Sequence, residues 1–332
     1  MPEGDPASFV PPPAPEARPE IREDVVIELP EYTPQIRPDD YRCFIVRWPE
    51  LTDRFVTGFG FAPGQPELVH HIIIFHAPAE DAALFQAMDD EDPGPGYTCY
   101  GGPTRTGSEA RVRPGQWAAW APGVGREPYA EGTGIPAPPG TVLIAQVHYN
   151  TGAAEPAADR SHIMFQVDDA VAHPAIFQLM SNPAWLAPGG MLIPAGEAEV
   201  QHSTDVEPGP FIDALTGGVE GLDTTGPLLL HSVGMHMHKL GKSGSLEVVR
   251  AGGDTECLLQ IPRWDFNWQK EFRLQTPLRL ERGDKVRLTC MFDNSAAHQP
   301  FVGGTQAEPT DVEWGEGTQD EMCLSIVYIT SP

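Results

Sequence analysis

Short apolar runs separated by turn residues recur along the chain from Tyr41 onward. They are rich in β-branched and aromatic residues and are bounded by Gly, Pro, Asp or Asn, which is typical of strands rather than helices. The clearest runs cover residues 43–46, 71–75, 141–144, 175–177, 227–230, 246–249, 285–288 and 325–328. Only one short segment, Ala79 to Met88, has a helical pattern. Strands without alternating helices predict an all-β protein made of antiparallel β-sandwiches of the jelly-roll kind.

Two tandem sandwich domains fit the 332 residues of the chain. A break near residues 167–170 predicts an N-terminal sandwich over residues 35–169 and a C-terminal sandwich over residues 170–332. The first 34 residues contain a Pro-Pro-Pro run and many acidic residues. Such a segment buries too little apolar surface to offset the entropy lost on ordering. We therefore expect residues 1–34 to be a disordered, Pro-rich acidic tether.

The charge of the chain narrows the range of partners. With 21 Lys and Arg against 47 Asp and Glu, the net charge is −26 at pH 7. Nucleic acids and anionic membrane surfaces would repel such a protein. No apolar run approaches the ~20 residues that a membrane-spanning helix needs. We therefore expect no nucleic-acid partner and no transmembrane segment.

His236 and His238 are two of the eleven histidines, and they are spaced as a metal-binding pair. Side chains at i and i+2 project from the same face of a strand, so two imidazoles can reach one ion. Met235 and Met237 then point to the opposite face, where we expect them to fill the core. A hydrogen-bonded core or edge histidine is the alternative interpretation.

His70 and His71 lie together in one apolar segment, and His148 lies in another. Adjacent residues alternate faces, so His70 and His71 reach a common ion only at a strand end, a twist or a bulge. Taken singly, these motifs do not decide between metal ligands and structural histidines. The remaining histidines have no such grouping and are expected to be structural or on the surface: His76, His162, His173, His202, His231 and His298.

The order of five short motifs makes the pattern specific. The chain resembles the copper type II, ascorbate-dependent monooxygenases, the family of peptidylglycine α-hydroxylating monooxygenase and dopamine β-monooxygenase. The resemblance covers about residues 40–330 and rests, in order, on Tyr41-Arg42-Cys43, His70-His71, Gln146-Val147-His148-Tyr149, His236-Met237-His238 and Asp320-Glu321-Met322-Cys323.

This resemblance implies two separate copper sites, one per β-domain, facing each other across a solvent-filled cleft. One copper, which stores and delivers an electron, would be held by His70, His71 and His148. The other, which binds O₂ and faces the substrate, would be held by the catalytic set His236, His238 and Met322. Imidazoles bind both copper oxidation states and a thioether favours Cu(I). The implied activity is hydroxylation of a C–H bond of a small organic substrate, with O₂ and ascorbate or a similar electron donor. Asp320 and Glu321 are candidates to orient the ligands.

The cysteines add a prediction about the compartment. The resemblance pairs Cys43 with Cys99 and Cys290 with Cys323, and leaves Cys257, which we expect to be a buried free thiol. Stable disulfides form in oxidising compartments. We therefore expect a periplasmic, cell-surface or secreted protein whose export signal is absent from this sequence, rather than a cytosolic protein.

The chain departs from the family where the substrate would bind. Gly234 stands where the peptidylglycine enzyme has an arginine that binds the substrate carboxylate, and Leu324 and Ile326 replace an asparagine and a tyrosine. Ala77 stands in place of a cysteine, so one animal disulfide is absent. We therefore do not expect a glycine-extended peptide as substrate, and the replacements favour a smaller or more apolar one. We expect the aromatic stretch from Trp264 to Gln269 to serve core and turn packing, and a substrate-lining role is the alternative interpretation.

Two other functions remain open from the sequence. A non-catalytic exported copper-binding or copper-storage protein on the same scaffold would take up copper without turnover. A structural or adhesive β-sandwich protein with incidental histidines would bind no copper tightly.

Overall fold

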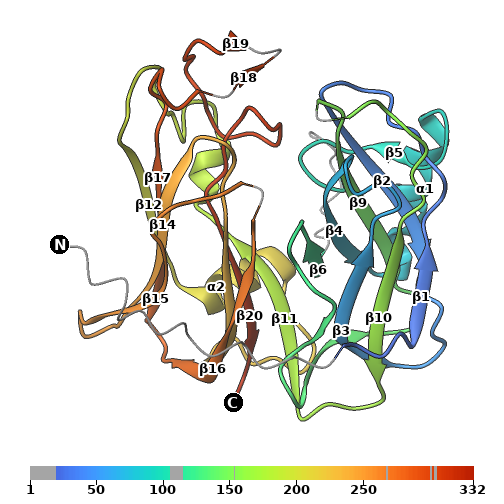
Figure 1. The fold of residues 1–332 in the computed structure, drawn as a ribbon. Helices are drawn as coiled ribbons and strands as arrows, with labels where there is room; N and C mark the ends of the chain where they lie inside the picture. Colours follow the sequence, from blue (N-terminus) through green and yellow to red (C-terminus); the bar gives the residue numbers. More distant parts are fainter. Residues whose placement is uncertain (1–19, 105–114, 153, 267, 300, 303–304) are drawn as a thin grey trace, which may run out of the picture.

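β-Strands dominate the computed structural model, which describes residues 20–104, 115–152, 154–266, 268–299, 301–302 and 305–332 (Figure 1). The elements up to residue 169, called here the N-terminal half, are β1 (Val25–Glu28), β2 (Asp39–Arg47), β3 (Arg54–Ala62), β4 (Val69–Ala77), η2 (Ala79–Asp81), α1 (Ala82–Glu91), β5 (Tyr97–Thr98), β6 (Gly115–Trp120), β7 (Glu127–Pro128), β8 (Thr133–Ala137), β9 (Val142–Asn150) and β10 (His162–Asp168). Those of the C-terminal half are β11 (His173–Met180), η3 (Pro183–Leu186), β12 (Val200–Val206), α2 (Pro208–Thr216), β13 (Leu228–His236), β14 (Gly241–Val249), β15 (Thr255–Ile261), β16 (Glu271–Leu280), β17 (Lys285–Phe292), β18 (Phe301–Val302), β19 (Thr305–Gln306) and β20 (Leu324–Thr330).

The sheets confirm the all-β prediction. The largest follows the order β1-β10-β3-β8-β11-β6-β4-β9-β2-β5 and continues from β11 through β20 and β13 to β16. A four-stranded sheet, β12-β17-β14-β15, lies in the C-terminal half. Neighbouring strands pair antiparallel, except for a short parallel contact between β8 and β11. The finer division into two jelly rolls with a boundary near residue 169 stays a prediction.

Two hydrophobic cores meet at a shared wall made of β11 and β20. Ala175 and Phe177 on β11 belong to the N-terminal core, whereas Ile176 and Met180 belong to the C-terminal core. On β20, Tyr328 faces the N-terminal core while its neighbours face the other. Alternate residues of a strand point to opposite faces, so one pair of strands serves both cores. β11 also pairs with β6 and with β8 of the N-terminal half, so backbone hydrogen bonds join the two halves.

The predicted tether is wrong for its last part, and residues 1–19 lie outside the described residues. β1 pairs along its length with β10, and Leu29 and Tyr32 are buried in the N-terminal core. Residues 25–28 read Val-Val-Ile-Glu, a strand-forming run inside the acidic segment. The composition of residues 1–34, taken as an average, is polar and rich in proline, so it does not reveal this short strand-forming run.

The helical segment expected at residues 79–88 is present as η2 followed by α1. A second helix, α2, was not predicted because its sequence opens with Pro-Gly-Pro. Proline is accepted in the first turn of a helix, where its missing N–H has no partner to lose. The helix ends at Gly217, whose φ of 75° is the left-handed conformation that glycine adopts readily. In the described part of the chain, no helix is long and apolar enough to cross a membrane.

Candidate metal centre

Three histidines of the N-terminal half converge at the start of β4 and the end of β9. His70 Nδ1 lies 3.1 Å from His71 Nδ1, which lies 3.4 Å from His148 Nδ1. Two imidazole nitrogens that bind one ion at ~2 Å with a tetrahedral angle are about 3.3 Å apart, so this spacing fits a metal site. The register of β4 against β9 shifts between Val69 and His71. That irregularity is what turns two adjacent side chains toward one point.

His148 is oriented by two residues of β2. Its Nε2 lies 2.8 Å from Asp39 Oδ1, and its ring stacks on Tyr41 with centroids 4.1 Å apart. With Nε2 donating to the carboxylate, Nδ1 is left as the ligand atom. Burial alone would raise the pKa of Asp39, yet hydrogen bonds from His148 and Thr318 bring that pKa to about 2. Asp39 is therefore ionised at neutral pH and fixes the tautomer of His148.

The second set of candidate ligands lies in the C-terminal half. His236 ends β13, His238 follows it, and their ring centroids are 5.0 Å apart. Nδ1 of His236 hydrogen-bonds Gln269 Oε1, and Nδ1 of His238 lies 2.9 Å from the Asp320 carbonyl oxygen. Both rings thus use Nδ1 for orientation and keep Nε2 for a ligand. Met322, which precedes β20, lines the same cavity as both histidines.

A buried glutamate ties Met322 to the histidine segment. One carboxylate oxygen of Glu321 accepts hydrogen bonds from the backbone N–H of His238 at 2.8 Å and of Met322 at 3.3 Å. The other accepts from the backbone N–H of Leu240. Burial raises the pKa of Glu321 to about 8, although these donors act in the opposite direction. The side chain of Glu321 therefore holds together two backbone segments that each carry a candidate ligand.

The two sets lie close together, whereas the resemblance implied two sites that face each other across a solvent-filled cleft. The rings of His71 and His236 are 6.3 Å apart, centroid to centroid. Phe266 lies between the halves, stacked on His70 at 4.5 Å and 6.0 Å from His238. Burial lowers the pKa of His70 to about 3 and that of His236 to about 4. These imidazoles are therefore neutral at pH 7, as a metal ligand must be.

The loop before Met322 is held by the N-terminal half. Thr318 donates to Asp39 from its backbone N–H, at 3.1 Å, and from its hydroxyl. Tyr100 donates to Asp320 Oδ2 at 2.6 Å, and Tyr41 donates to the Glu316 carbonyl. Asp39 thus contacts a ligand of one set and the loop that presents a ligand of the other.

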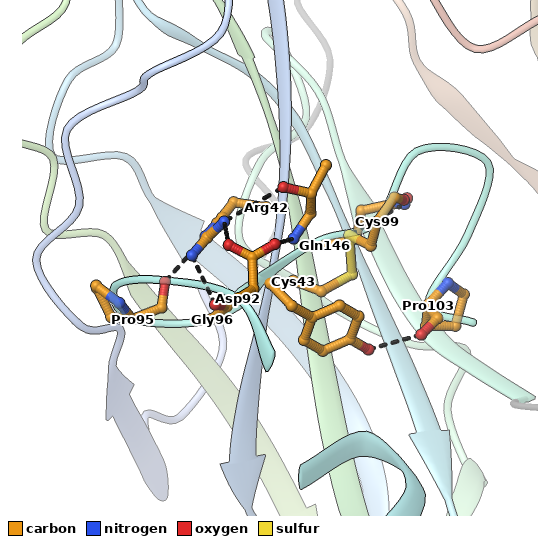
Figure 2. Close-up of a disulfide and its surroundings, with 10 residues drawn as sticks. Arg42, Cys43, Asp92, Pro95, Gly96, Cys99, Pro103 and Gln146 are labelled. Carbon is orange, nitrogen blue, oxygen red and sulfur yellow. Dashed lines mark hydrogen bonds and ion pairs between the residues drawn. A yellow bond between two sulfur atoms is a disulfide. The ribbon is translucent and has the colours of Figure 1, made fainter. Parts of the chain in front are cut away.

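The Cys43–Cys99 disulfide, drawn in Figure 2, ties β2 to the residue that precedes Tyr100. The Arg42 guanidinium donates to the Asp92 carboxylate at 2.8 Å and to the backbone carbonyls of Pro95 at 3.0 Å and Gly96 at 2.6 Å. Gln146, on β9, donates to the Cys99 carbonyl at 2.8 Å. Residues 101–103, which follow, line the cavity beside Met322.

Cys290 and Cys323 form the second disulfide, and Met235 and Met237 are buried in the C-terminal core. Cys257 is a free thiol but is exposed on edge strand β15, so the expectation that it is buried is wrong. The segment from Trp264 to Gln269 does more than pack, because Phe266 and Gln269 contact candidate ligands.

Asp39, Thr318 and Gln269 were missed as site residues because no local motif marks them. Asp39 and Thr318 are 279 residues apart in the chain. A carboxylate two residues before the Tyr41-Arg42-Cys43 motif was the only available signal for Asp39.

Residues 220–330 match the family model described as copper type II ascorbate-dependent monooxygenase, C-terminal domain. This segment is therefore similar to the C-terminal domain of that family. The family resemblance drawn from the order of the motifs is therefore confirmed. The matched segment contains His236, His238 and Met322, whereas the three histidines of the N-terminal half lie outside the match.

Solved structures add no functional information about this chain. The major capsid protein P2 from bacteriophage PM2 is 9% identical, with 92% of this chain and 97% of that chain covered and a TM-score of 0.31. The infectious bursal disease virus VP2 subviral particle is 7% identical, with 94% and 72% covered and a TM-score of 0.21. These scores are too low to carry an argument. No curated protein matches the chain in sequence.

Proposed function

We propose that this protein is a copper-dependent monooxygenase that hydroxylates a C–H bond of a small organic substrate, with O₂ and ascorbate or a similar one-electron reductant. The observation that carries the proposal is the position of His236, His238 and Met322 on the wall of an apolar cavity, within the matched domain. One oxygen atom of O₂ enters the C–H bond and the other leaves as water. Two molecules of reductant supply two electrons, and two protons complete the balance.

The donor atoms fit two copper ions. His70, His71 and His148 would hold one ion, and His236, His238 and Met322 would hold the other. Imidazole and thioether donors suit copper, and the thioether favours the Cu(I) state. Bound copper would supply the redox chemistry with O₂.

The other residues of the site position these ligands and shape the space beside them. Asp39 and Gln269 fix the ring orientation of His148 and His236, and Glu321 fixes the approach of Met322. The cavity wall beside Met322 is largely hydrocarbon, which disfavours water at the place where a C–H bond would react. Neutral, desolvated imidazoles are ready to bind metal without first losing a proton.

Copper stoichiometry is the first test. After loading with Cu(II) and exhaustive dialysis, elemental analysis of the full chain should give two coppers per chain. His148→Ala and His236→Ala should each reduce the value to one. A wild-type value of zero would refute the proposal, and a value of one would refute the two-site arrangement.

Turnover is the second test. Substrate-dependent O₂ consumption in the presence of ascorbate should be lost in Met322→Ala while the far-UV circular dichroism spectrum is unchanged. Hydroxylation that persists in this variant would refute the assignment of Met322.

Copper uptake without any turnover would instead support a non-catalytic copper-binding or copper-storage protein. The closeness of the two histidine sets favours this second candidate, since five clustered imidazoles can hold copper without a substrate. We further propose an extracellular, periplasmic or cell-surface location, which is supported by the two disulfides.

A further inference from the structure

The cavity beside Met322 has a volume of about 290 Å³ and lies between the two halves. Its walls come from β4 and β6 on one side and from β11 and β20 on the other. The side chains that these strands contribute are mainly apolar, among them Ile73, Phe75, Trp120, Phe177, Leu179 and Ile326. A ligand in this space would exchange water for hydrocarbon over most of its surface.

The neutral polar side chains of the lining already bond within the protein. Gln116 Oε1 accepts from the backbone N–H of Leu179 at 3.3 Å, and Gln146 Nε2 donates to the Cys99 carbonyl at 2.8 Å. Gln269 uses its oxygen for His236 and its nitrogen for the Phe266 carbonyl. Gln269 therefore has both amide atoms engaged, and Gln116 and Gln146 have one each, so the three amides offer a ligand few hydrogen bonds and no charge.

The charged residues of the lining do not form a binding site for one ion. Lys270 is exposed, and it is followed directly by Glu271, which accepts a hydrogen bond from Ser232. The two have opposite charges and also line a smaller neighbouring pocket. Burial and the nearby Asp320 raise the pKa of Glu316 to about 7, so burial disfavours its charged form. A charged ligand in the cavity would lose its hydration without a matched partner.

Gly234 and Ile326 explain why one wall is apolar. They are paired across β13 and β20, and Leu324 is paired with His236 on the same two strands. A Cβ atom on Gly234 would contact the Ile326 side chain at 3.4 Å. The same Cβ would lie 3.4 Å from the backbone oxygen of Lys270, so position 234, two residues before the candidate ligand His236, contributes no charged side chain of its own.

We infer that the substrate is an uncharged, largely hydrocarbon molecule of about ten non-hydrogen atoms, such as an alkylbenzene. The size follows from the cavity volume of about 290 Å³, which corresponds to roughly ten water volumes of ~30 Å³. The inference rests on the proposed function, since it assigns the substrate of that same site. The atoms and electrons balance as given above, with an alkylbenzene C–H bond becoming C–OH.

Binding of three ligands of similar size tests the substrate class without turnover. Isothermal titration calorimetry on the copper-loaded, oxidised full chain, with no reductant present, would compare propylbenzene, phenylacetate and 2-phenylethylammonium. Propylbenzene should bind at least ~100-fold more tightly than either ion, because an ion loses hydration in an apolar site. Binding of either ion within tenfold of propylbenzene would overturn the inference, as would a failure of propylbenzene to bind.

A cavity-filling variant locates the binding. Ala119→Phe places a ring in the lining and should reduce propylbenzene affinity at least tenfold. The matched control, Ala87→Phe, makes the same change on the exposed side of α1 and should leave the affinity unchanged. Unchanged affinity in Ala119→Phe would overturn the assignment to this cavity. The comparison of ligands on the wild-type chain stands even if this variant fails to fold. Loss of copper binding would instead contradict the proposed function, and ligand binding can then be measured on the copper-free chain.

Discussion

Removal of the Cys290–Cys323 disulfide should lower the free energy of unfolding of the C-terminal half. The size of this loss should follow from the length of the loop that the disulfide closes. The bond closes 33 residues between β17 and the start of β20, and both cysteines are buried. Loop-closure entropy for that length corresponds to about 4 kcal/mol at 25 °C. The double variant Cys290→Ala with Cys323→Ala should therefore lower the free energy of unfolding by about that amount. Because Cys323 follows Met322 directly, the variant should also release copper from the second set more readily.

Guanidinium-induced unfolding, followed by tryptophan fluorescence without reductant, measures the effect. Cys257→Ala is the control, since this exposed thiol is in no disulfide and its loss should change stability by less than about 0.5 kcal/mol. Removal of the Cys43–Cys99 bond, which closes 56 residues, should cost about 0.5 kcal/mol more than removal of the first, again from loop length. A loss below about 1 kcal/mol for the Cys290–Cys323 pair would show that loop entropy does not govern its contribution.

Three further predictions concern buried polar groups. Glu321→Gln replaces a carboxyl group that accepts backbone N–H bonds with an amide, so it should lower the free energy of unfolding by about 3 kcal/mol and weaken copper binding at Met322. An unchanged midpoint of denaturant unfolding would contradict this role. Asp39→Asn, which weakens the links to His148 and Thr318, should lower copper affinity about tenfold in a chelator competition, and equal affinity would refute it. Burial lowers the pKa of His76 from 6.5 to about 4, so its contribution to stability is full above pH 6.5 and falls by about 3 kcal/mol as the pH drops to 4. His76→Gln should flatten this part of the stability profile, and an unaltered pH dependence would show that other groups cause it.

The sequence by itself determined the class of the fold and the identity of the candidate ligands. The tendency of a short β-branched run between turn residues to form a strand depends only on residues close to it in the chain. The rule that residues two apart in a strand share a face is local in the same way. The pairing of the four disulfide cysteines and the family came from the order of motifs, and the structure and the family match agree with both.

Tertiary structure alone decided how the candidate ligands are arranged. The irregular register between Val69 and His71, the use of Asp39 by both sets, and the position of Phe266 all depend on contacts between segments far apart in the chain. The same holds for β1, which forms because β10 offers it an edge. A sequence pattern reports which face a side chain takes on its own strand. It does not report which distant segment that face will meet, because that depends on how the whole chain packs.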